Sequence, residues 1–133
     1  MKKKTVFTAV MAAVLWTLAA CGASKTEENT YRQISTEEAV AMMAEETDYV
    51  ILDVRTQEEY EAAHIPGAIC IPNEMIGDEE IPELPDKERL IMVYCRSGNR
   101  SKQASGKLVK LGYTNIVEFG GINSWTGETE CMK

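Results

Sequence analysis

The chain has few of the residues that usually hold metal ions, and this scarcity narrows its chemistry. It contains one histidine, His64, and four cysteines among 133 residues. Cys70 and Cys131 do not stand at a spacing from histidine or from another cysteine that is typical of a zinc site. A glycine motif for a dinucleotide is also missing, as are internal repeats and low-complexity tracts. We therefore expect no metal and no organic cofactor.

Positive charge is scarce as well, and it is unevenly placed. The chain has 14 Lys and Arg against 21 Asp and Glu, a net charge of −7. This balance argues against nucleic acid or an anionic membrane surface as a partner. Residues 78–88 carry six acids, whereas residues 89–117 carry six basic residues and no acid. A local positive field inside an acidic protein favours a small anionic ligand.

The apolar segment at the start of the chain is too short to span a membrane comfortably. Val6–Ala20 is fifteen residues without charge and follows three lysines, a pattern typical of an export signal. It ends in Leu-Ala-Ala-Cys-Gly at 18–22, which resembles the lipobox of bacterial lipoproteins. The resemblance implies a signal peptide over 1–20 and a diacylglycerol on Cys21, followed by a flexible linker over 21–30. The alternative is an ordinary export signal that leaves Cys21 free.

These features predict an extracytoplasmic protein with a lipid anchor in a bacterial membrane. Two acyl chains suffice for stable anchoring, because each buried methylene contributes about 0.8 kcal/mol. Removal of residues 1–20 takes three basic residues and no acid, so the net charge becomes −10. The remaining chain is long enough for one domain, over 31–133, and too short for two.

Apolar runs that alternate with helical patterns predict an α/β fold. Two capping boxes, Ser35–Glu38 and Thr56–Glu59, mark helix starts. The last helix is expected at 101–111, with Gly112 as its C-cap. Strands are expected at 31–34, 49–54, 68–71, 89–94 and 115–119. This order predicts a mostly parallel five-stranded sheet with helices on both faces and a ligand site beyond the carboxyl ends of its strands.

Cys95 stands at one of these carboxyl ends, between an apolar strand and a helix start. The loop that follows is small and basic: Arg96, Ser97, Gly98, Asn99, Arg100 and Ser101. Backbone amides and a helix N-terminus that converge on a sulfur stabilise its thiolate, and the two arginines add full positive charge. We therefore expect Cys95 to have a lowered pKa and to act as a nucleophile.

Several separated segments together resemble the rhodanese family of sulfurtransferases, and they occur in the family's order. They are Leu52-Asp53-Val54-Arg55, Glu58-Glu59-Tyr60, His64-Ile65-Pro66-Gly67-Ala68, the Cys95 loop, and Gly120-Gly121-Ile122-Asn123-Ser124-Trp125. The resemblance implies a cysteine persulfide mechanism with no metal or cofactor. A small anionic sulfur donor such as thiosulfate and a thiol-type acceptor are the implied partners.

The resemblance also implies roles for residues around the loop. Asp53 and Arg55 are expected to support it, with Asp53 bonded to loop amides or to Arg100; a strand-terminal cap with a surface salt bridge is the alternative and stays open for Arg55. Their positions near the end of a strand predict side chains on opposite faces. His64 is expected to belong to a structural turn and not to be a catalytic base. Trp125 either walls the pocket or packs on the core.

Two alternatives to this interpretation can be stated. The first is a phosphatase or an arsenate reductase of the same fold. The family's phosphatases carry one residue more between cysteine and arginine, whereas here four residues separate Cys95 from Arg100, which favours sulfur transfer. A persulfide carrier or a binding module without rapid turnover is the second alternative. A disulfide between Cys70 and Cys131 is possible outside the cytoplasm and stays open, as do the natural donor, the acceptor and the oligomeric state.

Overall fold

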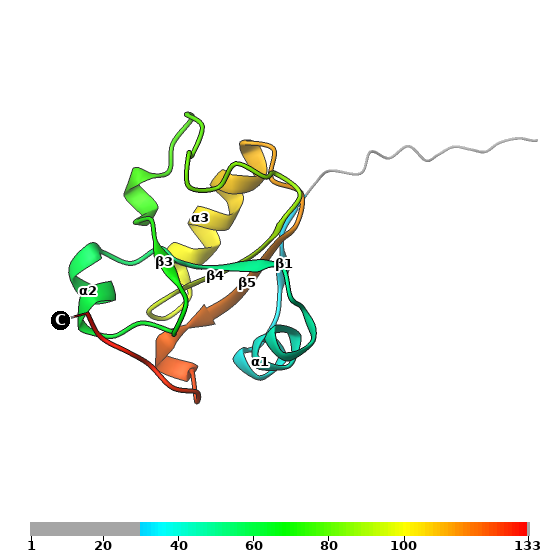
Figure 1. The fold of residues 1–133 in the computed structure, drawn as a ribbon. Helices are drawn as coiled ribbons and strands as arrows, with labels where there is room; N and C mark the ends of the chain where they lie inside the picture. The colour runs from blue at the N-terminus through cyan, green and yellow to red at the C-terminus, as the bar shows by residue number, and fades with distance from the viewer. Residues whose placement is uncertain (1–29, 133) are drawn as a thin grey trace, which may run out of the picture.

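Five parallel strands form one sheet through the middle of the molecule (Figure 1). The computed structural model describes residues 30–132, so the predicted signal peptide and Cys21 lie outside the described residues. The strand order is β1-β5-β4-β2-β3. The strands are β1 (Arg32–Gln33), β2 (Tyr49–Asp53), β3 (Ile69–Cys70), β4 (Leu90–Cys95) and β5 (Ile116–Gly121). This confirms the predicted five-stranded α/β fold.

Helices cover both faces of the sheet, as predicted. On one face α1 (Thr36–Glu45) covers a cluster that includes Ala39 and Met92. On the other face α3 (Asn99–Lys110) contributes Leu108 to a second cluster, which includes Val93. The two clusters are separate because alternate residues of each strand point to opposite faces. Cys95 belongs to the α3 face.

Both predicted capping boxes are present. Ser35 Oγ accepts from the Glu38 amide, and the Glu38 carboxylate accepts from the Ser35 amide. Thr56 and Glu59 do the same at the start of α2 (Gln57–Ala62). Each box satisfies amides that the first helical turn would otherwise leave without acceptors.

The structure differs from the predicted boundaries next to Cys95. Helix α3 begins at Asn99, two residues earlier than predicted, because Gly98 takes a left-handed conformation (φ +114°) and turns the chain directly into the helix. Strand β5 runs on to Gly121 instead of ending at Phe119. Two short 3₁₀ turns complete the elements, η2 (Asn73–Met75) and η3 (Ile122–Ser124).

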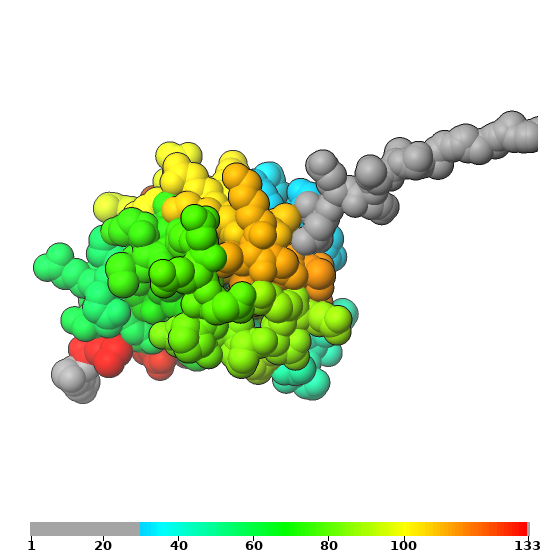
Figure 2. Space-filling model, turned by 90° about the horizontal axis from the view of Figure 1, so that it is seen from above, coloured from blue at the N-terminus to red at the C-terminus, as the bar shows by residue number. Residues whose placement is uncertain are grey.

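Two long segments outside the helices and strands pack against the rest of the domain. The acidic segment 78–88 lies beside the end of α3 (Figure 2), where Lys87 Nζ donates to the carbonyl of Leu111. The C-terminal segment lies against α2 (Figure 1), where Glu130 pairs through its backbone with His64. None of the helices between residues 30 and 132 is long and apolar enough to cross a membrane.

Candidate active site

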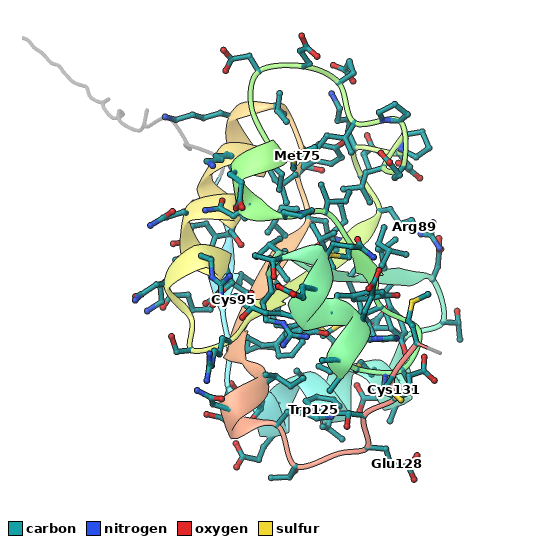
Figure 3. The ribbon with its side chains drawn as sticks, turned by 90° about the vertical axis from the view of Figure 1, so that its left-hand side faces the viewer. Met75, Arg89, Cys95, Trp125, Glu128 and Cys131 are labelled. Carbon is teal, nitrogen blue, oxygen red and sulfur yellow. The ribbon has the colours of Figure 1, made fainter. Side chains whose placement is uncertain are left out.

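The Cys95 sulfur lies where β4 meets the start of α3 (Figure 3). The residue is only 1% exposed. The amide of Gly98 donates to Sγ at 3.0 Å, and the thiol contacts Oγ of Ser101 at 3.5 Å. The loop therefore closes directly around one sulfur atom, as the sequence predicted for its amides.

This surrounding lowers the pKa of Cys95. Burial alone would raise the pKa, but the side chain of Ser101 and the amides of Ser101, Gly98 and Ser97 hydrogen-bond to the thiolate and outweigh that effect. The N-terminus of α3 acts in the same direction, and its first turn contains no acid. Cys70 shows the opposite case, because burial and the nearby Asp53 raise its pKa to about 11.

Glycine at 121 allows the last strand to lie against the loop. A Cβ on Gly121 would lie 2.0 Å from the carbonyl oxygen of Arg96, which is far inside contact distance. The amide of Asn123 donates to that same carbonyl at 3.1 Å. The close approach of β5 to Arg96 therefore fixes the start of the loop.

The two loop arginines have different surroundings. The side chain of Arg96 is exposed, as are Ser97 and Asn99. Arg100 instead forms a bidentate pair with the Glu59 carboxylate, at 2.8 and 3.2 Å. This hydrogen bond from Arg100 lowers the pKa of Glu59 to about 2, although burial opposes the shift. Glu59 thus offsets the charge of one of the two arginines that were expected to add positive charge around Cys95.

The contacts predicted for Asp53 are wrong. Asp53 is fully buried and bonds to Arg55, whose Nη2 lies 2.7 Å from Oδ2, and to the hydroxyl of Tyr94 at the same distance. Strand β2 ends at Asp53 and the chain bends at Arg55, whose amide and guanidinium both donate to the Asp53 carboxylate, so the two side chains meet instead of diverging. Tyr94 belongs to the α1 face, opposite to Cys95, which explains why Asp53 does not reach the loop amides or Arg100.

Arg55 supports the neighbouring turn instead of the loop itself. Its Nη2 donates to the carbonyl of Ala63 at 2.6 Å, and the Tyr94 hydroxyl accepts from the amide of Ile65. His64 lies in this turn, stacked on Tyr60 with 3.9 Å between ring centroids. Nδ1 of His64 lies 2.7 Å from the carbonyl of Tyr60, and Nε2 lies 3.2 Å from the Glu130 carboxylate.

The remaining predicted residues lie away from Cys95. Trp125 packs against Phe119 with 6.0 Å between ring centroids, which places it on the core of the α1 face. Cys70 and Cys131 are both free thiols, so the disulfide considered from the sequence is not formed. Cys131 is exposed in the C-terminal segment, apart from Cys95 (Figure 3).

One residue of the site was missed in the sequence. Glu118 is 2% exposed and lies beneath the loop, where its Oε2 accepts from Ser101 Oγ and from the amide of Gly120 at 3.0 Å. An acid inside the apolar run 116–119 was a usable signal, since the same pattern singled out Asp53 in its own strand. Ser101 belongs to α3 and Glu118 to β5, so the two residues meet only in the folded chain.

Comparisons with known proteins find a family and several relatives for this chain. The Rhodanese-like domain family model matches residues 35–128. The thiosulfate sulfurtransferase PspE of Escherichia coli (strain K12) is 38% identical over 71 residues, which cover 53% of this chain and 68% of that protein. The thiosulfate sulfurtransferase GlpE of Coxiella burnetii (strain RSA 331) is 36% identical over 96 residues, covering 71% of this chain and 87% of that protein. A solved structure described as a rhodanese with anions from E. coli has a TM-score of 0.58 at 32% identity, covering 62% of this chain and 98% of its own.

Proposed function

The chain belongs to the rhodanese-like domain family, and from this premise we propose that it is a sulfurtransferase that works through a persulfide on Cys95. The donor is thiosulfate or a similar small anion, and the acceptor is a thiol, or cyanide in an assay. The observation that carries the proposal is the closure of the loop on one sulfur, with the Gly98 amide 3.0 Å from Sγ. Relatives named as thiosulfate sulfurtransferases support the choice of donor.

The reaction has two displacement steps. The Cys95 thiolate attacks the outer sulfur of thiosulfate, an S–S bond forms to Cys95, and the S–S bond of the donor breaks with sulfite as the leaving group. The terminal sulfur of the persulfide then carries the negative charge. The loop amides, including that of Gly98, stabilise this charge. A thiolate or cyanide attacks the terminal sulfur, and Cys95 leaves again as a thiolate.

Electrostatic attraction brings the donor to the loop. Arg96 is exposed and Arg100 is half-buried at the start of α3. We assign the sulfonate part of the donor to these two arginines, with Arg100 shared between the donor and Glu59. Since the predicted mature chain carries a net charge of −10, a local cation is needed to offset the repulsion of an anion.

Intact-mass measurement after exposure to thiosulfate tests the proposal. The full chain should gain one sulfur atom, and a Cys95→Ser variant should gain none while retaining its circular dichroism and melting temperature. A Cys70→Ser variant is the matched control and should gain sulfur as the unchanged protein does. Release of that sulfur to cyanide at each turnover would support the enzyme. Sulfur uptake without turnover would identify a carrier instead.

We also propose that Cys21 carries a lipid and anchors the protein outside the cytoplasm. The support is the sequence alone, namely Leu-Ala-Ala-Cys-Gly after an apolar segment. Metabolic labelling with a palmitate analogue should mark the chain and miss a Cys21→Ala variant. Equal labelling of both proteins would contradict lipidation of Cys21 and favour an ordinary export signal.

A further inference from the structure

A carboxylate is buried beneath the Cys95 loop on a strand whose neighbouring residues are apolar. Glu118 follows Val117 in β5 and is 2% exposed, and none of the ion pairs between residues 30 and 132 includes it. Strand alternation turns it to the same face as Ile116, which is the face that holds Cys95. A buried carboxylate without a cation is costly, so hydrogen bonds must compensate for the lost solvation.

Those hydrogen bonds form a continuous path to the nucleophile. The Cys95 thiol donates to Oγ of Ser101 at 3.5 Å, and Oγ of Ser101 donates to Oε2 of Glu118. Ser101 is fully buried, so water does not reach the middle of the path. Oγ of Ser101 also lies within hydrogen-bond distance of the carbonyls of Gly98 (3.0 Å) and Gly120 (3.3 Å). A hydroxyl has one proton, and the carboxylate is the strongest acceptor among these groups.

One further charged group acts on this path, because Arg100 interacts electrostatically with Cys95 although its guanidinium is paired with Glu59. The cross-strand neighbours of Glu118 are uncharged, namely Gln33 on β1 and Val93 on β4. From α3 it meets Ser101, and Arg100 on that helix is held by Glu59. Through Ser101, hydrogen bonds therefore connect Glu118 to the titratable side chain of Cys95.

We propose that Glu118 is a positioning residue that accepts the proton of Cys95 through Ser101 before the sulfur reacts. The inference rests on the proposed role of Cys95 as nucleophile. The S–H bond breaks as an O–H bond forms on Ser101, and the original Ser101 proton moves to Oε2 of Glu118. The total charge stays constant, because a thiol and a carboxylate become a thiolate and a carboxylic acid. After the transfer every hydrogen bond is reversed, so Ser101 donates to the thiolate.

This role and a passive carboxylate predict opposite effects of Glu118→Gln. A carboxylate that only lies near the sulfur disfavours the thiolate by like-charge repulsion, so its removal would speed thiolate chemistry. A proton acceptor supplies the thiolate at neutral pH, so its removal would slow that chemistry. If Glu118 only stabilised the shape of the loop, Glu118→Gln would change the rate of thiolate chemistry by the same factor at every pH.

Alkylation by iodoacetamide measures the thiolate without any sulfur donor, so it can fail or succeed independently of the proposed activity. The full chain with Cys21, Cys70 and Cys131 changed to serine leaves Cys95 as the only thiol. Its alkylation rate should be nearly independent of pH around neutrality. With Glu118→Gln the rate should fall about tenfold for each pH unit below the new midpoint and should match the parent at alkaline pH. Infrared difference spectra should show a protonated-carboxyl band in the parent that is missing in the variant.

Two further variants keep the inference falsifiable. Glu80→Gln removes one negative charge from a side chain that is 78% exposed in the acidic segment, and it should leave the profile of the parent unchanged. Ser101→Ala breaks the path while Glu118 is retained, so if Glu118→Gln does not fold, Ser101→Ala should show both the loss at low pH and the disappearance of the protonated-carboxyl band of the parent. An equal or faster rate in Glu118→Gln, a pH-independent loss, or a Ser101→Ala variant with the profile of the parent would each overturn the inference.

Discussion

Glu59→Gln should increase the use of an anionic sulfur donor, because it releases Arg100. Glutamine keeps the capping box with Thr56, which accepts either residue at this position, so the start of α2 is preserved. The variant removes the carboxylate that takes both terminal nitrogens of Arg100 at 2.8 and 3.2 Å. It therefore separates the electrostatic role of Glu59 from its role in the helix.

The size of the effect follows from the pKa of Glu59. The hydrogen bond from Arg100 is the main reason that this pKa falls from 4.5 to about 2. A shift of that size corresponds to about 3 kcal/mol. The Thr56 hydrogen bonds supply part of it, and solvent screens a pair whose side chains are 26% and 31% exposed. We therefore expect about 1 kcal/mol from Arg100 alone, which is roughly a fivefold change in an equilibrium constant.

The assay compares kcat/KM for thiosulfate with kcat/KM for a neutral persulfide donor. In Glu59→Gln the thiosulfate value should rise about fivefold at low ionic strength, with a smaller gain in salt, while the neutral donor is unaffected. Arg100→Ala should lower the thiosulfate value and spare the neutral donor. If either variant changes both donors by the same factor at every salt concentration, Arg100 braces the loop and does not bind the donor.

The same ion pair makes stability depend on pH. Glu59 has a lowered pKa in the folded chain, so its contribution is complete above about pH 4.5, where the unfolded residue is ionised. The contribution disappears as the pH falls through about 2, where the folded residue takes up its proton. The difference in unfolding free energy between the parent and Glu59→Gln should therefore be about 1 kcal/mol at neutral pH and vanish near pH 2.

Further predictions concern the thiols and the glycines. In chains with one remaining thiol, the alkylation rate of Cys95 should reach half its maximum at a pH below 9.0, the ordinary pKa of a thiol. The alkylation rate of Cys70 should reach half its maximum at about pH 11. A lower midpoint for Cys70 than for Cys95 would contradict the assigned electrostatics. Gly121→Ala should lower both the melting temperature and sulfur transfer, because its Cβ would lie 2.0 Å from the carbonyl oxygen of Arg96. Gly106→Ala in α3 is the matched control, with no atom within 4 Å of the added Cβ, and should stabilise the chain by about 0.5–1 kcal/mol. Similar melting temperatures for the two glycine variants would show that the approach of β5 to the loop is loose.

Local patterns predicted most of the fold. The two capping boxes and the buried strands β2 and β4 depend on short-range periodicity, and the structure confirms them. The start of α3 was predicted two residues late because the left-handed Gly98 begins the helix without a side-chain cap. That error also placed Arg100 in the loop, whereas it belongs to the helix.

The contacts of the site were harder to predict than its location. Cys95 lies at the carboxyl end of a strand, as expected from the topology. The partners of the site residues depend on which face each strand presents, and they are far apart in the chain. Arg100 meets Glu59 across 41 residues, and Ser101 meets Glu118 across 17. No local pattern encodes either pair.

The close fit between Gly121 and Arg96 has a consequence for how the protein matures. The loop after Cys95 takes its shape only when β5 has docked, because the amide of Asn123 holds the carbonyl of Arg96. Glu118 arrives on the same strand. During synthesis Cys95 is therefore made before β5, the strand on which the shape of its loop depends. A nascent or truncated chain that ends before β5 would carry Cys95 as an ordinary thiol, and reactivity would begin with the docking of the last strand.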